Sequence, residues 1–172
     1  VEEKQKGTME HLNVTPLKKS TFILAKLIPY WIIGYIVLTI CIIVGRLAYG
    51  LIPQGSLFLV YLFATLFILA YSGFGLVLSN YAKTIQQAMF MMFFFVLTFV
   101  FMSGLFTPIE NMPHWAQLFS NISPLKYIMQ AVRAIFIKGA SINELLPQLK
   151  WLIGMVIFSN TWAILSYRKK SN

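Results

Sequence analysis

The residues of this sequence that could do chemistry are few and lie far apart. Its one cysteine, Cys41, and its two histidines, His11 and His114, match no metal-binding spacing. There is no GxxxxGK[ST] loop to bind ATP. The carboxylates are Glu2, Glu3, Glu10, Glu110 and Glu144, all outside the apolar segments. No paired carboxylates lie within these segments, so an intramembrane hydrolase and a proton-driven carrier are disfavoured and no cofactor is expected.

Asn160 is the most polar side chain deep inside an apolar segment. It could line a pathway through the membrane, or it could make a hydrogen bond between packed helices, and the packing interpretation is favoured. A second patch of interest is the run of small residues at Ser72, Gly73 and Gly75. Small residues let membrane helices approach closely, so this patch predicts a helix contact.

Four long apolar blocks, 27–45, 56–80, 86–106 and 151–167, are the elements that must position these residues. A spanning helix needs about 20 mostly apolar residues, and 58% of the chain is hydrophobic while 11% is charged. The sequence therefore predicts an all-α polytopic membrane protein. Its four transmembrane helices are expected at about 16–47, 56–80, 85–106 and 142–167. The net charge is +9, and most of the lysines and arginines flank these blocks. This position favours lipid headgroups over nucleic acid as their partner.

Two amphipathic segments, 114–122 and 124–138, separate the last two predicted spans. Their apolar residues recur at helical spacing, and Ser123-Pro124 resembles a helix start while Gly139 is a plausible stop. Lys126, Arg133 and Lys138 would each cost about 2.5–3.5 kcal/mol at the centre of a bilayer. We therefore expect helices that lie at the outer interface, or dip in and return, rather than a further span.

Helix starts and the distribution of cations complete the expected topology. Thr15-Pro16 predicts the start of the first long helix, and Ser141-x-x-Glu144 has the form of a capping box that opens the last. Nine of the 14 lysines and arginines fall on one predicted side of the membrane. The positive-inside rule then places both ends of this chain in the cytoplasm. The expected location is the inner (cytoplasmic) membrane of the cell.

Two ordered motifs resemble one family, the bacterial ABC-2 type transporter permeases. The first resembles the cytoplasmic segment of these permeases, and its matching residues are Glu3, Gly7, Thr8, Glu10, Leu12, Thr15 and Pro16. The second resembles the external region after their fifth span, and its residues include Pro108, Glu110, Pro113, Pro124, Tyr127 and Arg133. The chain departs from the family at the front of the first motif, where it has Glu2-Glu3-Lys4-Gln5-Lys6.

The resemblance implies a six-span permease of the drug-efflux-like branch, of which this chain would hold the C-terminal portion. The start at Val1 is consistent with a piece of a longer protein. Segment 1–14 would be an amphipathic coupling helix that docks on a separate ABC-type ATPase subunit, and 15–172 would be the transmembrane region. A second permease subunit, identical or different, would complete the transporter. Segments 107–122 and 124–138 would be the external helices that re-enter the outer leaflet.

The expected function is that of a permease subunit without its own ATP site, in an ATP-driven exporter. The spans offer aromatic and methionine surface but no fixed charge, so we expect an amphipathic substrate such as a drug, lipid or glycolipid. The alternative is a non-transporting membrane anchor or assembly subunit, which a four-span architecture alone would permit. A membrane enzyme is disfavoured by the lack of acid or histidine in any span.

Overall fold

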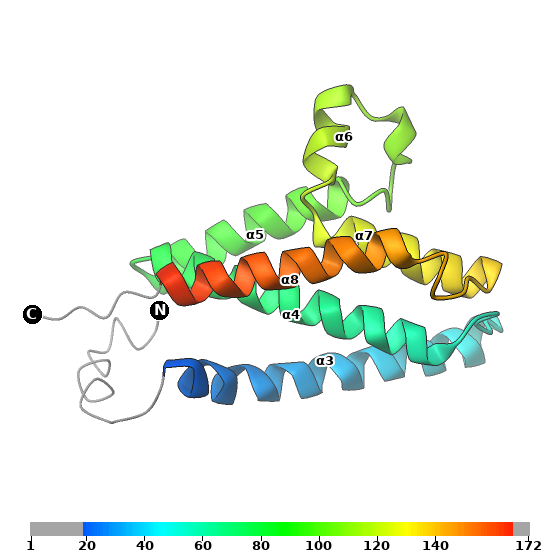
Figure 1. The fold of residues 1–172 in the computed structure, drawn as a ribbon, viewed down its shortest axis with the longest axis horizontal. Helices are drawn as coiled ribbons and strands as arrows, with labels where there is room; N and C mark the ends of the chain where they lie inside the picture. The colour runs from blue at the N-terminus through cyan, green and yellow to red at the C-terminus, as the bar shows by residue number, and fades with distance from the viewer. Residues whose placement is uncertain (1–18, 167–172) are drawn as a thin grey trace, which may run out of the picture.

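The computed structural model describes residues 19–166, and every regular element among them is a helix. Four helices are long: α3 (Lys19–Tyr49), α4 (Leu57–Tyr81), α5 (Ile85–Phe101) and α8 (Leu146–Ser166). Shorter helices join α5 to α8, namely η1 (Ile109–Asn111), α6 (His114–Ser120), α7 (Pro124–Arg133) and the π-helix η2 (Ala134–Lys138). The expectation of an all-helical protein is confirmed for this part of the chain, and α3, α4 and α8 run lengthwise together (Figure 1).

Three of the helices are long and apolar enough to cross a membrane: Leu27–Tyr49 within α3, Leu57–Tyr81 and Leu146–Ser166. Helix α5 is mostly apolar after Gln86 and Gln87 but has 17 residues, which give about 25 Å of helix. A polytopic membrane protein is therefore supported. The fourth span, α5, stays a prediction.

Two helix ends differ from the sequence-based expectation. Helix α5 ends at Phe101, five residues before the expected 106. The chain reverses there because Gly104 has a φ of +81°, a left-handed conformation that glycine adopts without steric cost. Helix α8 begins at Leu146 rather than at 142. Glu144 does accept a hydrogen bond from the Ser141 N–H at 3.1 Å, but this closes a turn that precedes the helix instead of opening it.

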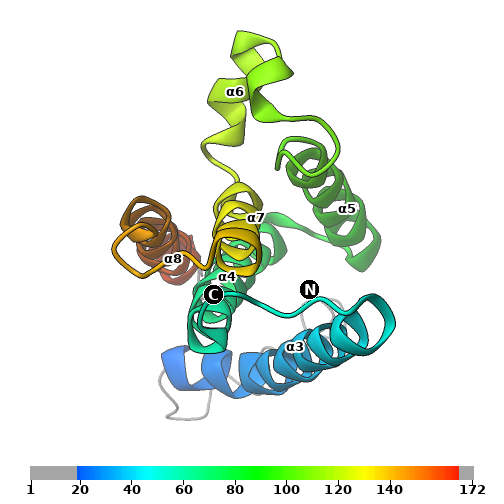
Figure 2. The same cartoon turned by 90° about the vertical axis from the view of Figure 1, so that its right-hand side faces the viewer.

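Helix α4 is the centre of the fold, with α8, α7 and α5 around it (Figure 2). Its N-terminal half packs on α7 and α8 in one apolar cluster, whose members are Leu59, Val60, Phe63, Tyr127, Ala131, Ile135, Ala140, Leu145 and Leu152. Its C-terminal half packs on α8 through Gly73, where a Cβ atom would lie 2.7 Å from Ser159 Oγ. The predicted close helix contact at Gly73 is confirmed, whereas Gly75 has only Met92 Cε at 3.8 Å.

Helix α3 lies apart from this core, on the far side of α4 from α7 (Figure 2). No residue of its most apolar stretch is buried. A ladder of three side-chain hydrogen bonds joins it to α4, and the pairs are Trp31 with Ser72 at 3.4 Å, Tyr35 with Thr65 at 2.7 Å and Thr39 with Tyr61 at 2.8 Å. Such bonds between membrane helices contribute about 0.6–2 kcal/mol each. Apolar contacts accompany them, because a Cβ atom at Gly34 would lie 3.0 Å from Ile68 Cδ1 and Ile42 packs against the core cluster.

Candidate functional site

The residues predicted to couple to an ATPase lie outside the described part of the chain, so their placement stays a prediction; they are Glu3, Gly7, Thr8, Glu10, Leu12, Thr15 and Pro16. The six residues predicted for the external region are all described, and the structure separates them into two groups. Pro124 and Tyr127 are buried. Pro108, Glu110, Pro113 and Arg133 are exposed.

Prolines and a serine set the path of the chain between α5 and α7. Pro113 precedes the first turn of α6, and its carbonyl accepts hydrogen bonds from the N–H groups of Ala116 and Gln117. Pro124 occupies the first turn of α7, directly after Ser123, where the missing N–H of proline costs no helical hydrogen bond. Helix α6 projects away from the long helices, and α7 returns to them (Figure 1).

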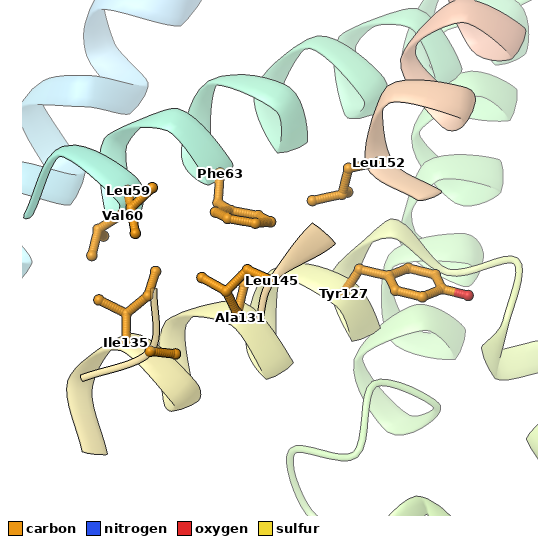
Figure 3. Packing of buried hydrophobic residues seen from close by; sticks show 9 residues of the cluster. Leu59, Val60, Phe63, Tyr127, Ala131, Ile135, Leu145 and Leu152 are labelled. Atoms are coloured by element: carbon orange, nitrogen blue, oxygen red, sulfur yellow. The ribbon is translucent and has the colours of Figure 1, made fainter. Parts of the chain in front are cut away.

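Helix α7 lies beside α4 and α8 with one face buried. Ile135, just beyond α7 in η2, packs near Leu59 and Val60 at the start of α4, while Tyr127 lies at the other end of the cluster (Figure 3). The Tyr127 ring stacks on Trp151 of α8, with centroids 5.7 Å apart and an interplanar angle of 16°. Helix α7 thus packs on two long apolar helices, and the choice between the interfacial and the re-entrant placement stays a prediction.

A clasp of backbone contacts fastens the end of α7 to the loop before α4. The N–H groups of Gln54 and Gly55 donate to the carbonyls of Phe136 and Ile135, at 3.4 and 3.0 Å. These carbonyls belong to the π-helix η2, whose wider hydrogen-bond pattern is often found at functional sites. The helix stops at Gly139, in the left-handed conformation with a φ of +64°, so the stop predicted from the sequence is confirmed.

Lys126 forms a polar cluster at the start of α7, where the chain turns from α6. Its Nζ donates to Asn121 Oδ1 at 2.6 Å and to Ser120 Oγ at 3.3 Å, and it lies 5.7 Å from the centre of the Tyr127 ring. The Tyr127 hydroxyl donates to the Asn121 carbonyl at 3.0 Å. Desolvation by burial lowers the pKa of Lys126 and raises that of Tyr127.

Ser123 lies next to this cluster in the same turn. Its N–H donates to the Ser120 carbonyl at 3.1 Å, and both serine side chains are fully buried. The Ser123 hydroxyl has no hydrogen-bond partner among the described residues. From the sequence, Lys126 was expected only to resist burial in the membrane. The cluster around it was not predicted, because no local sequence signature indicates the turn at 120–123.

Asn160 joins two long helices. Its Nδ2 donates to the carbonyl of Leu69 in α4 at 3.2 Å and to the carbonyl of Val156 in its own helix at 2.9 Å. This is the geometry of the packing interpretation. Asn80 of α4 also joins these two helices, although it was not predicted to do so. Its Nδ2 donates to Ala163 O at 3.1 Å and to Ser166 Oγ at 2.9 Å, both in α8.

The described residues hold no group of three or more His, Cys, Asp or Glu side chains placed to bind a metal ion. Cys41 is exposed on α3, and His114 is exposed at the start of α6. The arrangement in residues 19–166 is therefore one of packed apolar helices, a short amphipathic helix beside them and a small polar cluster.

Comparisons with known proteins point to membrane transport. The family profile described as ABC-2 type transporter matches residues 1–137. The probable multidrug ABC transporter permease YbhR of Escherichia coli K12 is 31% identical over 168 residues, 98% of this chain and 46% of the relative. YbhS of the same strain, also a probable multidrug ABC transporter permease, is 30% identical over 80% of this chain and 37% of its own length. The linearmycin resistance permease protein LnrN of Bacillus subtilis is 23% identical over 85% of this chain and 38% of its own length.

This chain thus spans less than half the length of these relatives. No solved structure matches it.

Proposed function

Because this chain belongs to the ABC-2 type transporter family, we propose that it is part of the permease of an ATP-driven exporter that moves an amphipathic substrate out of the cytoplasm. The observation that carries this proposal is the family match over residues 1–137, joined to apolar helices of spanning length. A drug as substrate is supported by the relatives named as multidrug and linearmycin resistance permeases. A lipid or glycolipid is proposed because the spans offer aromatic and methionine surface but no fixed charge. ATP would be hydrolysed by a separate ABC-type ATPase subunit, and a second permease subunit would complete the complex.

The proposed mechanism is a rocking motion between two states. Closure of the ATPase subunits would push on segment 1–14, and the push would pass through Thr15-Pro16 into α3. The position of α3 supports this route, because it is the first described helix after Thr15-Pro16 and the hydroxyls of Tyr35 and Thr39 bond to Thr65 and Tyr61 of α4. A shift of α3 would therefore be passed to α4 through these contacts.

The coupling proposal is tested with the complete permease and its ATPase in inside-out vesicles. Glu10→Lys and Gly7→Pro should abolish substrate-stimulated ATP hydrolysis and ATP-dependent uptake, because both residues lie in the family's coupling motif. Glu2→Lys is the matched control, since it makes the same charge reversal outside that motif and should leave both activities intact.

The same experiment separates transport from the alternative role. Membrane insertion and expression of the variants should equal those of the unmodified protein, because these residues lie outside the predicted spans. If deletion of residues 1–12 leaves ATPase association and export unchanged, the coupling assignment is wrong. If the unmodified complex binds its ATPase but moves none of a panel of amphipathic drugs and lipids, the anchor function gains.

A further inference from the structure

Helices α3 and α4 are joined by two matching pairs of hydroxyl groups. Each helix carries the sequence Tyr-x-x-x-Thr, with Tyr35 and Thr39 in α3 and Tyr61 and Thr65 in α4. Each threonine hydroxyl donates to the carbonyl of the tyrosine in its own helix, at 2.7 Å. Because a hydroxyl has one hydrogen, each threonine accepts its second bond from the tyrosine hydroxyl of the other helix, at 2.7 Å from Tyr35 and 2.8 Å from Tyr61. A shift of one helix along the other would break both bonds at once.

A single carbonyl group of α4 links α3 to α8. Leu69 O accepts a hydrogen bond from Ser72 Oγ at 3.1 Å, and Ser72 Oγ accepts one from Trp31 Nε1 of α3 at 3.4 Å. The same carbonyl accepts a bond from Asn160 Nδ2 of α8 at 3.2 Å, and the missing side chain at Gly73 lets α8 approach closely at this level. Within a bilayer no water replaces a lost partner, so these bonds oppose movement of α3 or α8 against α4.

Helix α5 contacts α4 through aromatic rings, on a different side of α4 from α3 and α8 (Figure 2). The ring centroid of Phe74 lies 5.2 Å from that of Phe95 and 5.5 Å from that of Phe99, and the Tyr71 and Phe99 centroids are 6.3 Å apart. Aromatic pairs are favourable in several offset and edge-on arrangements, and phenylalanine recurs along α5. A slide of α5 along α4 would therefore exchange one aromatic contact for another.

The polar side chains of α5 do not bind it to its neighbours. Gln87 Oε1 accepts a hydrogen bond from the Lys83 N–H just before the helix, at 2.9 Å, and Thr98 Oγ1 donates to Phe94 O of the same helix at 2.8 Å. Within residues 19–166, no hydrogen bond or ion pair joins α5 to another long helix, and α5 has no buried residue. Movement of α5 against α4 thus breaks no directional bond, unlike movement of α3 or α8.

We propose that α3, α4 and α8 form one rigid block, held by these hydrogen bonds, and that α5 shears against the block along the aromatic seam. Sliding of packed helices is a known form of conformational change, and it occurs where the contacts can be exchanged. The block deepens the rocking mechanism of the proposed function, and only its response to ATP rests on that function. A push on α3 would reach α8 through α4 and would change the boundary between α4 and α5. The rival explanation is that all four long helices move together.

The test measures distances between pairs of spin labels in the complete permease with its ATPase, in lipid nanodiscs and a Cys41→Ser background. Tyr30→Cys in α3 or Phe90→Cys in α5 is combined with Leu165→Cys in α8; all three side chains are exposed. Labelled permease is diluted with unlabelled permease, so that each complex carries one labelled pair. Double electron–electron resonance is recorded without nucleotide and after trapping with ATP and vanadate.

The α3–α8 pair should give one narrow distance distribution that is the same in both states. The α5–α8 pair should give a broader distribution that shifts by about 1–2 Å or more on trapping, the size of helix shifts seen in switching proteins. Thr65→Val, which removes the hydroxyl that accepts from Tyr35, should broaden the α3–α8 distribution, and so should Asn160→Leu. Thr98→Val is the matched control, because its hydroxyl bonds only within α5, and it should leave the α3–α8 distribution unchanged.

Each outcome decides between the explanations. If the α3–α8 distribution is as broad as that of α5–α8, or is unchanged by Thr65→Val and Asn160→Leu, hydrogen bonds do not hold a block. If the α5–α8 distribution is equally narrow and does not shift, α5 moves with the other helices and the rival explanation is correct. A broad α5–α8 distribution that does not respond to ATP would support the block and would contradict the ATP coupling of the proposed function.

Discussion

Gly73 and Gly154 are both glycines inside long helices, yet the structure gives them opposite roles. A Cβ atom at Gly73 would lie 2.7 Å from Ser159 Oγ and 3.0 Å from the backbone nitrogen of Asn160. At Gly154 it would meet nothing within 4 Å. Close approach of α4 and α8 therefore depends on Gly73, while Gly154 makes no close contact in the described part of the chain.

We therefore expect Gly73→Ala to lower the free energy of unfolding by about 1–3 kcal/mol, the usual cost of an overpacked contact. Gly154→Ala is the matched control and should raise it by up to about 1 kcal/mol, because alanine favours a helix more than glycine does. Thermal unfolding of the purified permease in detergent would measure both. Equal effects of the two substitutions would mean that α4 and α8 are not packed as described.

Asn160 and Lys126 show how far single residues can be interpreted from sequence. The hydrogen bond of Asn160 to Leu69 was foreseeable, because an amide inside an apolar helix must find a partner, and a neighbouring helix is the nearest source. The position of Lys126 was not foreseeable. Its environment depends on residues 120–123, which form a turn, and on the direction in which α7 leaves that turn.

Among the elements, the clasp between the loop at 54–55 and η2 has a sharp steric requirement. A Cβ atom at Gly55 would lie 3.1 Å from both Ile135 Cγ2 and Ile135 O, and 3.3 Å from the backbone carbon of Gly139. Two of these three atoms belong to the backbone and cannot turn aside. Gly55→Ala should therefore weaken the hydrogen bonds that Gln54 and Gly55 donate.

The expected cost is about 1–3 kcal/mol in the local opening free energy, because two backbone hydrogen bonds contribute about 0.5–1.5 kcal/mol each. Hydrogen exchange of the 50–56 segment would measure it, and exchange there should become faster. Gly45→Ala serves as the control, since its Cβ atom would have only Leu51 Cδ1, at 4.0 Å. Unchanged exchange in Gly55→Ala would show that the clasp does not hold α7.

Helix boundaries were predictable where a local signal decides them. Gly139 ends its helix as expected because a left-handed residue suits glycine. The apolar run beyond Phe101 continues to 106, yet α5 stops earlier, because Gly104 turns the chain toward η1. The π-helix η2 also escaped prediction, since it depends on two N–H donors from a loop about 80 residues earlier in the chain.

The whole molecule makes a topological prediction that rests on its charges. With four spans and both ends of this chain in the cytoplasm, Lys83 lies inside and Arg133 outside. Both residues are exposed. In a Cys41→Ser background, a membrane-impermeant thiol reagent applied to intact cells should label Arg133→Cys and leave Lys83→Cys unlabelled, and permeabilised cells should be labelled at both positions. Labelling of position 83 from outside would rule out this topology, and labelling of both positions from outside would rule out a spanning α5.

Helix α7 is synthesised after one of the helices on which it packs and before the other. It packs on α4, which precedes it, and on α8, which follows it. When the ribosome has completed α7, Tyr127 still lacks Trp151, and the cations of the segment favour the aqueous surface. The stacking of Tyr127 on Trp151 therefore forms only after α8 has been made, whereas the contacts of α7 with α4 do not need it. Synthesis of α8 thus completes an apolar cluster that α4 and α7 begin.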